Sequence, residues 1–578
     1  IRIQFPVVKE VVDANKARDL FKEGVKNYKE GEYTDKVFAS SKFKESLTYK
    51  FRENPSLGYL ILTYAELYPN AAKPTKAARN LFRLIKIGQK KVLNDSRVAM
   101  GTAIFYSNNG KHLTAVNTIE NYLRINKPTT KMLAAYLDVL IKSGNIAQAG
   151  KLVDKVKKFN NKPPRMYLAL SSFYKIDERF DKGKKIVIEG LKKHPKDVPL
   201  LLEYADYLFT DQKMERFQKV LERVDKENSE RSPVYYAKFL ENMGILSAYK
   251  GDKEKAAKLF NLALKIKEST ELRSKLAALD LEGEKSVNAL VLESKVVQLL
   301  NKAKRAADMR KWEDAFVYAI EAADMLPTHI GAKILLSEIQ IERGYFQEAI
   351  DTLLGLKKEF PLNMKVQYYL GLAYIKSSKL KKAESHITRI DQRLHKSPRF
   401  TELLGRFYNS KNNVLQAVKW FNRTIKKEPL NDEIYYELAK IYLANRKYDK
   451  GKENLTEAIY LDPRNVYYRS AYAKILFEME GAATAIGYLR DVMEDHQNHP
   501  KLIGDIAIYY YKNGQLKQFE EYKKKLESMN PQNASFYEFM VKASQLEDKD
   551  KELIKYARKL IKVNPGDLET KMMLGEFF

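Results

Sequence analysis

The side chains that could act as acids, bases or metal ligands do not form a recognisable catalytic group. His496 and His499 lie close together in the segment DHQNHP, but no acidic or thiol partner follows in the order of a zinc site. The adjacent carboxylates Glu520 and Glu521 are typical of a solvated helix surface. The sequence contains no Cys and none of the phosphate-loop, dinucleotide, HExxH or GxSxG motifs. We therefore expect no catalytic residue, no metal site and no cofactor, and the chain is predicted not to be an enzyme.

A second set of residues combines positive charge with aromatic rings at regular intervals. Arg406, Lys440 and Lys474 follow one another at a constant interval, and Lys542 continues the series two intervals later. Aromatic residues lie at neighbouring slots of the same period: Tyr368, Tyr436, Tyr467, Phe477 and Tyr511. Cations bind carboxylates and aromatic rings add apolar contact area, so this combination favours an extended, acidic and partly aromatic protein segment. A solvated surface that simply tolerates lysine explains the same residues.

These intervals belong to a 34-residue repeat that places proline at fixed positions in the C-terminal half. The prolines of this register are Pro327, Pro361, Pro429, Pro463, Pro531 and Pro565. Proline cannot continue a helix and restricts the residue before it, so each one is expected to follow the end of a helix.

Two columns of mostly small residues share the same period. The first column lies at a fixed distance before the proline slots and holds Ala315, Ala349, Ala383, Ala417, Gly451 and Ala485. The second column lies the same distance further upstream and holds Ala303, Ser337, Gly371, Gly405, Ala439, Ala473 and Ala507. Each unit is therefore predicted to contain two apolar-periodic helices, A and B, whose backbones approach closely at the small residues.

The pattern resembles the tetratricopeptide repeat family. One unit matches it with Tyr369-Leu370-Gly371, Tyr374, Ala383 and Ile387, and the next with Leu404-Gly405, Tyr408, Ala417, Phe421 and Pro429. The resemblance implies an all-α, right-handed superhelical solenoid of roughly fifteen helix–turn–helix repeats. Turns are expected near Gly110, Gly144, Gly251, Gly344 and Gly514, and β-structure only within the first few residues, which include the alternating segment IRIQF.

In this family helix A lines a concave groove that binds protein segments. The resemblance therefore implies a partner-binding groove formed by Tyr368, Arg406, Tyr436, Lys440, Lys474, Phe477, Tyr511 and Lys542. Arg406, Lys440 and Lys474 are expected to align as a ladder along it. The family subtype that clamps a C-terminal carboxylate carries Lys and then Asn at the next matching position of helix A. The corresponding pairs here, such as Glu402/Arg406 and Tyr436/Lys440, lack this clamp.

The repeat register breaks near the segment LEGEKS and divides the array. We expect an N-terminal extension or the end of an upstream domain at residues 1–16, a divergent array at 17–283, and a regular array at 284–578. The last repeat of the regular array is incomplete, because DLETKMMLGEFF supplies a helix A without a helix B. The natural protein is therefore expected to continue past Phe578, or another subunit is expected to cover this end.

The net charge of +29 favours acidic partners, although a solvated convex surface kept soluble by charge also accounts for it. The aromatic residues lie on core columns, and nucleic-acid-binding motifs are absent, so nucleic acid is not the favoured partner. No small-molecule substrate is expected. The predicted function is a non-catalytic protein–protein interaction scaffold that binds an acidic segment or neighbouring subunits of a larger assembly.

The cellular setting is predicted from weaker features of the sequence. The absence of Cys, a start at Ile1 without a signal-peptide pattern, and the long array favour a bacterial envelope machine for motility, pilus assembly, secretion or polysaccharide export. A periplasmic or envelope-associated location follows, and no apolar run is long enough to span a membrane. The alternative is a cytoplasmic adaptor that binds nucleic acid or acidic partners through its basic surface.

Overall fold

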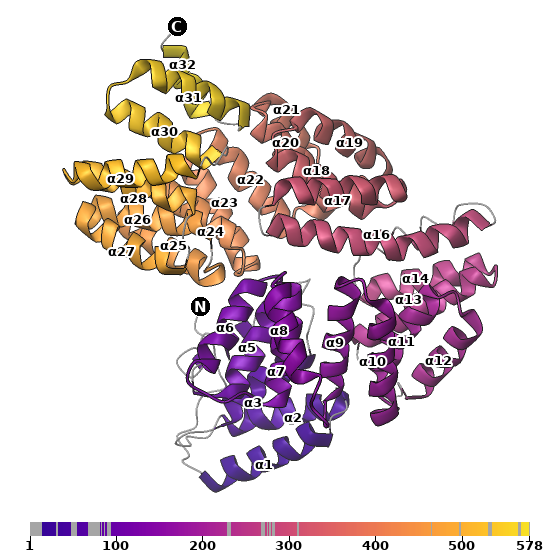
Figure 1. Ribbon diagram of the computed structural model, residues 1–578. Helices are drawn as coiled ribbons and strands as arrows, with labels where there is room; N and C mark the ends of the chain where they lie inside the picture. Colours follow the sequence, from indigo (N-terminus) through magenta and orange to yellow (C-terminus); the bar gives the residue numbers. More distant parts are fainter. Residues whose placement is uncertain are drawn as a thin grey trace. The chain divides into compact units, whose positions relative to one another are not determined.

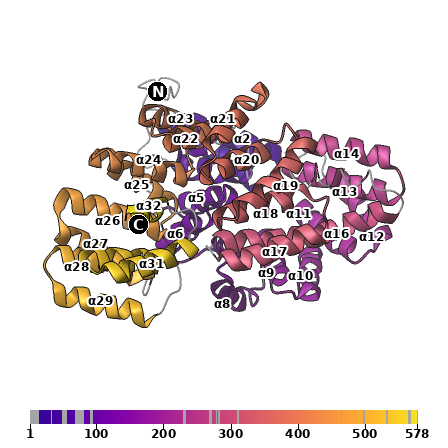
Figure 2. The same cartoon turned by 90° about the horizontal axis from the view of Figure 1, so that it is seen from above.

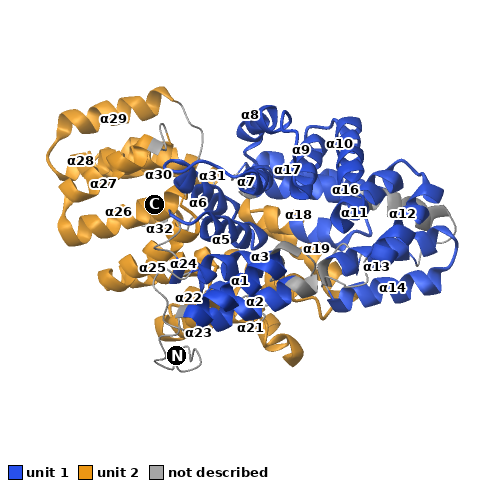
Figure 3. Ribbon diagram, turned by 90° about the horizontal axis from the view of Figure 1, so that it is seen from below, with its two compact units in different colours: residues 1–335 blue, residues 336–578 orange. Residues whose placement is uncertain are grey.

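The computed structural model divides the chain into two compact units, residues 1–335 and 336–578 (Figure 3). The structure describes residues 14–30, 33–47, 55–67, 94–227, 233–266, 284–308, 311–463, 465–495, 499–529, 534–563 and 568–576, with single positions between 81 and 88 and between 272 and 279. Every regular element in these residues is helical, which confirms the predicted all-α solenoid. The segment IRIQF lies outside the described residues.

Helix pairs follow one another along each unit (Figures 1 and 2). Unit 1 contains α1 (Ala14–Glu30), α2 (Tyr33–Ser46), α3 (Ser56–Leu67), α5 (Ser96–Asn108), α6 (His112–Leu123), α7 (Thr130–Lys142), α8 (Ile146–Val156), α9 (Pro164–Ile176), α10 (Phe180–Lys193), α11 (Val198–Thr210), α12 (Met214–Glu227), α13 (Pro233–Tyr249), α14 (Lys253–Ile266), α16 (Glu284–Asp308) and α17 (Trp312–Met325). The division between the units falls inside α18 (Ile330–Glu342).

Unit 2 continues with the same alternation of helices A and B. It contains α19 (Phe346–Glu359), α20 (Met364–Lys376), α21 (Leu380–Thr388), the 3-10 turn η2 (Gln392–Leu394), α22 (Pro398–Ser410), α23 (Val414–Lys427), α24 (Asp432–Ala444), α25 (Tyr448–Leu461), α26 (Val466–Glu480), α27 (Ala482–Asp495), α28 (Pro500–Lys512), α29 (Leu516–Ser528), α30 (Ala534–Leu546), α31 (Asp550–Val563) and α32 (Leu568–Glu576). The fifteen or so predicted repeats are consistent with these helices.

Helices A form the inner side of each stack. Successive A helices pack on one another, as α7 does on α9 and α28 does on α30. In the described part of the chain, consecutive B helices make no comparable contact. A curved stack brings its elements closer on the inside of the bend, so we call the surface of helices A the inner face and that of helices B the outer face.

The small-residue columns mark where the two helices of a repeat meet. Ala417 and Ala383 of helix B are fully buried, and so is Ala473 of helix A. Gly405 shows why size matters, because a Cβ atom built on it would lie 2.4 Å from Cδ1 of the buried Phe421. The columns therefore set the distance between α22 and α23, as the sequence predicted.

In the repeats whose A–B turn the structure describes, the turn after helix A contains a residue with a positive φ angle. The predicted glycine turns are confirmed, with φ between 74° and 84° at Gly110, Gly144, Gly251, Gly344 and Gly514. At other repeats the same conformation is adopted by Glu178, Gln212, Ser378, Asn412, Arg446 and Asp548, with φ between 54° and 59°. For residues with a side chain this conformation costs about 1 kcal/mol, which the packed helix pairs must offset.

The prolines end helix B as predicted. Helix α19 ends at Glu359, shortly before Pro361, and α23 ends at Lys427, shortly before Pro429. Pro531 and Pro565 lie outside the described residues.

The predicted domain limits are not tested by the described residues. Residues 280–283 are outside them, so the limit at 283 stays a prediction, and α16 begins at Glu284. Residues 1–13 are also outside, and α1 begins at Ala14. At the other end α32 occupies the expected helix A slot, and its Met573 and Leu574 pack partly against the core of unit 2. Continuation past Phe578 stays a prediction.

Candidate partner-binding face

All eight predicted partner-binding residues lie on helices A of unit 2. Tyr368 lies on α20, Arg406 on α22, Tyr436 and Lys440 on α24, Lys474 and Phe477 on α26, Tyr511 on α28, and Lys542 on α30. Lys440, Lys474 and Lys542 are exposed, Arg406, Tyr436, Phe477 and Tyr511 are half-buried, and Tyr368 is buried. The shared helix type fits the predicted face, while the differences in burial divide the residues into two groups. Their role in partner binding stays a prediction.

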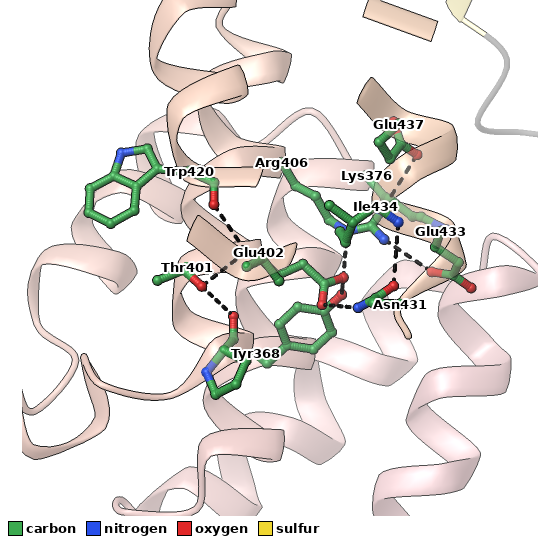
Figure 4. Close-up of polar contacts among 12 residues, drawn as sticks. Tyr368, Lys376, Thr401, Glu402, Arg406, Trp420, Asn431, Glu433, Ile434 and Glu437 are labelled. Carbon is green, nitrogen blue, oxygen red and sulfur yellow. Dashed lines mark hydrogen bonds and ion pairs between the residues drawn. The ribbon is translucent and has the colours of Figure 1, made fainter. Parts of the chain in front are cut away.

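Arg406 is held by three carboxylates of the protein itself (Figure 4). Its Nε donates to Glu402 at 3.0 Å, a terminal nitrogen donates to Glu433 of α24 at 3.1 Å, and the other lies 3.6 Å from Glu437. Burial alone would lower the pKa of Arg406, but Tyr368 and the carboxylates hold it above its ordinary value. Arg406 therefore joins α22 to α24 through charges that are already matched.

The carboxylate of Glu402 is the centre of this network. Tyr368 donates its hydroxyl to Glu402 Oε1 at 2.5 Å, and Asn431 donates to Oε2 at 3.4 Å. The guanidinium of Arg399 lies over the Tyr368 ring, 5.3 Å from its centroid. Burial raises the pKa of Tyr368, so its hydroxyl stays a proton donor. We call Tyr368, Arg399, Glu402, Arg406, Glu433 and Glu437 the paired segment.

Two repeats further on, the inner face carries cations with fewer partners. Lys474 and Lys542 have no hydrogen bond or ion pair with any residue that the structure describes. Lys501, at the start of α28, lies 3.0 Å from Asp505 and 3.9 Å from Glu538 of α30. We call Lys474, Lys501 and Lys542 the cationic segment.

The other two ammonium groups of the cationic segment act on Lys542. The pKa of Lys542 is lowered, first by desolvation of its ammonium group and then by the positive charges of Lys501 and Lys474. The nearby carboxylates of Asp505 and Glu538 raise the pKa but offset only part of this decrease. Lys474 and Lys542 belong to α26 and α30, with α28 between them, so the effect of Lys474 on Lys542 fits the inside of a bend. Within unit 2, unmatched positive charge therefore lies on α26 and α30.

The aromatic side chains near these cations are fixed by their own contacts. Phe477 stacks on Tyr509 with ring centroids 5.1 Å apart, and Lys512 Nζ lies 4.6 Å from the Phe477 centroid. Tyr436 packs on Tyr468 at 4.8 Å. Elsewhere on the face, the Tyr511 hydroxyl donates to the carbonyl of residue 546 at 2.8 Å. Rings held in this way lose little freedom when a ligand packs on them.

Lys440 combines the exposure of the cationic segment with the charge pairing of the paired segment. It is exposed, pairs with Glu437 at 2.9 Å and lies 5.0 Å from the centroid of the Tyr436 ring. Its charge is shared with a carboxylate that also faces Arg406. The predicted ladder of Arg406, Lys440 and Lys474 thus runs from a fully matched cation to an unmatched one.

Unit 1 matches several of its inner-face charges in the way that the paired segment does. Lys175 of α9 pairs with Glu203 of α11 at 2.7 Å, and Lys238 of α13 lies 3.3 Å from Asp206 of α11. Glu241 lies 2.9 Å from Lys275. Burial would raise the pKa of Glu241, but Lys238 and Lys275 lower it to about 2. Pairing between neighbouring repeats is thus a recurrent way of neutralising this face.

The sequence pattern alone did not single out Glu433, Glu437 or Lys501. Glu402 stands one helical turn before Arg406, a spacing at which side chains on a helix contact each other. The contact between these two residues could therefore be predicted from the sequence. Glu433 and Glu437 belong to the next repeat and reach Arg406 only after the helices pack. Lys501 lies in a different column, which holds Arg399, Glu433, Tyr467 and Lys501 at the repeat interval. A comparison of this column between repeats would have identified Lys501.

The histidines play structural parts where the structure describes them. Nδ1 of His499 accepts a hydrogen bond from the backbone N–H of Lys501 at 3.3 Å and caps α28. His496 lies outside the described residues. Among the described positions, no three His, Asp or Glu side chains group as metal ligands. Nor does any described helix combine the length and apolar character needed to cross a bilayer.

A family model agrees with this architecture. Residues 420–453, from the middle of α23 to the start of α25, match the model for the tetratricopeptide repeat. The chain thus contains a tetratricopeptide repeat, as the sequence pattern predicted. The helix pairs, the turn column and the small-residue columns extend the same unit well beyond the matched segment.

Other tetratricopeptide repeat proteins are similar to parts of the chain. Over 132 residues it is 30% identical to the anaphase-promoting complex subunit CDC16 of Saccharomyces cerevisiae. This match covers 22% of the chain and 16% of the length of the yeast protein.

Solved structures resemble it at lower identity. The Cut9–Hcn1 hetero-tetramer of the anaphase-promoting complex is similar over 79% of this chain and 98% of that one, with a TM-score of 0.37 and 12% identity. PilF of Pseudomonas aeruginosa is similar over 37% and 97% of the two chains, with a TM-score of 0.27 and 16% identity.

Proposed function

We propose that this protein is a non-catalytic scaffold that binds an extended, acidic and partly aromatic protein segment along the inner face of α24–α30. The tetratricopeptide repeat fold is that of a protein–protein interaction scaffold. The observation that carries the more specific proposal is the set of exposed cations Lys440, Lys474 and Lys542 on the inner face that also carries the fixed rings of Tyr436 and Phe477. Exposed cations and aromatic rings on one face complement a segment that carries carboxylates and aromatic side chains.

The spread of these residues supports an extended ligand. They lie on α24, α26 and α30, and neighbouring packed helices are about 9 Å apart, so three steps cover about 27 Å. An extended chain advances about 3.3 Å per residue and covers this distance with about eight residues. A small molecule would reach only part of the set.

Photo-crosslinking from matched positions tests this function. A photoreactive residue at Ser470, half-buried on α26, should crosslink the full-length chain to a defined partner protein in the source cells. The same residue at Glu453, exposed on the outer helix α25, should not. Equal crosslinking at both positions, or crosslinking only at Glu453, would contradict binding on the inner face.

We also propose that the scaffold is a periplasmic or envelope-associated part of a bacterial machine for motility, pilus assembly, secretion or polysaccharide export. The absence of Cys supports this, because a chain without thiols cannot be oxidised to wrong disulfides. Release of the full-length protein from intact source cells by osmotic shock is the expected result. Its retention with cytoplasmic markers would contradict the location and leave the binding proposal untouched.

A second candidate function is binding of nucleic acid through the basic surface. Residues 151–196 contain 14 Lys and Arg against 5 Asp and Glu. The exposed lysines of this region are Lys151, Lys155, Lys157, Lys158, Lys182, Lys185, Lys192, Lys193 and Lys196. Binding of single-stranded RNA that falls steeply with salt and weakens in a Lys192→Gln/Lys193→Gln variant would favour this candidate.

A further inference from the structure

We propose that Lys474 and Lys542 form an anion-binding pair that holds neighbouring carboxylates of the bound segment, and that Lys501 positions this pair. This inference rests on the proposed function and assigns the acidic part of the ligand to a specific place on the inner face. The ligand chemistry is an acidic peptide with closely spaced Asp or Glu side chains.

The first argument is a comparison of matched slots two repeats apart. Arg406 and Lys474 occupy the same slot on α22 and α26, and three slots supply the carboxylates around Arg406. Around Lys474 the slot of Glu402 holds Ser470, the slot of Glu433 holds Lys501, and the slot of Glu437 holds Asp505. Two of the three carboxylates that surround Arg406 therefore have no counterpart around Lys474. One of these two is replaced by the cation Lys501.

The remaining carboxylate is already engaged. Asp505 lies 3.0 Å from Lys501 Nζ, and Lys501 also approaches Glu538 at 3.9 Å. Glu538 stands one helical turn before Lys542 on α30, so Lys501 draws a carboxylate of that helix toward α28. Lys501 thereby orders the first turns of α28 and α30, and Lys474 and Lys542 keep no described partner.

The surface between the two lysines suits a bound chain. The slot that separates Lys474 from Lys542, on α28, holds the half-buried Ile508. An apolar floor strengthens ion pairs above it because it displaces water from one side. A segment that places carboxylates near Lys474 and Lys542 would also relieve the repulsion that contributes to the lowered pKa of Lys542.

Binding of a defined probe to the full-length chain tests the assignment. The probe is a fluorescein-labelled peptide of alternating glutamate and tyrosine, followed by fluorescence anisotropy, and the control probe has glutamine in place of glutamate. Lys474→Gln and Lys542→Gln should each weaken binding about tenfold. Lys419→Gln, at an exposed position on the outer helix α23, should leave it unchanged.

A transplant variant sharpens this test. Ser470→Glu combined with Lys501→Glu rebuilds around Lys474 the carboxylates that surround Arg406, and should abolish binding of the acidic probe. Circular dichroism melts show whether each variant is folded, and Lys474→Gln, at an exposed position, keeps the proposal falsifiable if the transplant variant unfolds. Equal effects of Lys474→Gln, Lys542→Gln and Lys419→Gln would overturn the assignment and indicate attraction by overall charge.

The outcomes separate this inference from the proposed function. If Ser470 crosslinks a partner protein but the lysine variants bind the probe normally, the inner face is used and the anion-binding pair is wrong. If Ser470 gives no crosslink, the proposed function fails as well. Displacement of the probe by single-stranded RNA in a manner that depends on Lys474 would overturn the choice of an acidic peptide.

Discussion

The paired and cationic segments lie on the same kind of helix, two repeats apart, and differ at only a few slots. Arg406 is surrounded by Glu402, Glu433 and Glu437, whereas the corresponding surroundings of Lys474 are Ser470, Lys501 and Asp505. Both segments keep the small residues and the buried core of the repeat, as at Gly405 and Ala473. In a solenoid, each repeat contacts mainly its neighbours, so side chains on the inner face can change from internal pairing to ligand binding without disturbing the core.

The difference also explains why a column of positive charge is an ambiguous signal. Arg406, Lys440 and Lys474 all carry the charge that an acidic ligand needs, but the first is neutralised by its own chain and the second is shared with Glu437. A cation on the inner face is therefore a candidate for binding when the slots around it have lost their acids. Within unit 2 this criterion, rather than the number of cations, distinguishes α26–α30.

The largest expected effect comes from substitutions at the slot that Arg406 and Lys474 share. Arg406→Ala leaves the buried Glu402 without its guanidinium partner and should lower the free energy of unfolding of the segment by about 3 kcal/mol. Lys474→Ala, at the same slot, should change it by less than about 0.5 kcal/mol because the side chain is exposed and unpaired. Urea unfolding followed by circular dichroism compares the two, and similar losses in both variants would contradict the division.

A smaller effect concerns the turns, where the two regions also differ. Ser378 after α20 has φ 59°, and Gly514 after α28 has φ 74°, at slots related by whole repeats. Ser378→Gly should raise the thermal stability by an amount equivalent to about 0.5 kcal/mol, and Gly514→Ser should lower it by about 1 kcal/mol. Differential scanning calorimetry checks both changes. A loss of stability in Ser378→Gly would show that its hydroxyl contacts, and not its backbone, dominate that turn.

The smallest effect is a pH dependence confined to the cationic segment. In the folded state the pKa of Lys542 is lowered, first by desolvation of its ammonium group and then by the positive charges of Lys501 and Lys474. The unfolded chain therefore keeps this proton to higher pH, and stability rises as the pH increases from the folded pKa to about 10.4. Lys542→Gln should be more stable than the natural sequence at neutral pH, and this advantage should shrink as the pH approaches about 10.4. Lys419→Gln serves as control, and a constant or growing advantage would contradict the lowered pKa of Lys542.

The repeat fold could be predicted from the sequence because its determinants recur. The small residues at Gly405 and Ala417, the glycine turns and the prolines after helix B all share one period, and each has one local physical meaning. The structure confirms them where it describes them. The positive φ angles at Ser378 and Asn412 were not predicted, because the sequence there gives no glycine and the packing of the helix pair imposes the conformation.

The candidate face could be located from the sequence, but its division into a paired segment and a cationic segment could not be predicted. The slot of Arg406 and Lys474 follows from the repeat register, and Glu402 follows from its spacing along one helix. The contacts from Glu433 and Glu437 depend on how α24 packs on α22, and a count of charges in one column does not contain that information. The replacement of Glu433 by Lys501 two repeats later was visible in the sequence, but its meaning required the contacts around Arg406.

Lysine footprinting of the natural sequence tests the central claim most directly. The full-length protein is acetylated briefly with and without the peptide of alternating glutamate and tyrosine, and mass spectrometry measures the modification of each lysine. The peptide should protect Lys474 and Lys542 strongly, Lys440 less, and Lys419 on the outer face not at all. Equal protection of Lys419 and Lys474, or no protection of Lys474 under conditions where the peptide is bound, would contradict the assignment of the acidic ligand to the cationic segment.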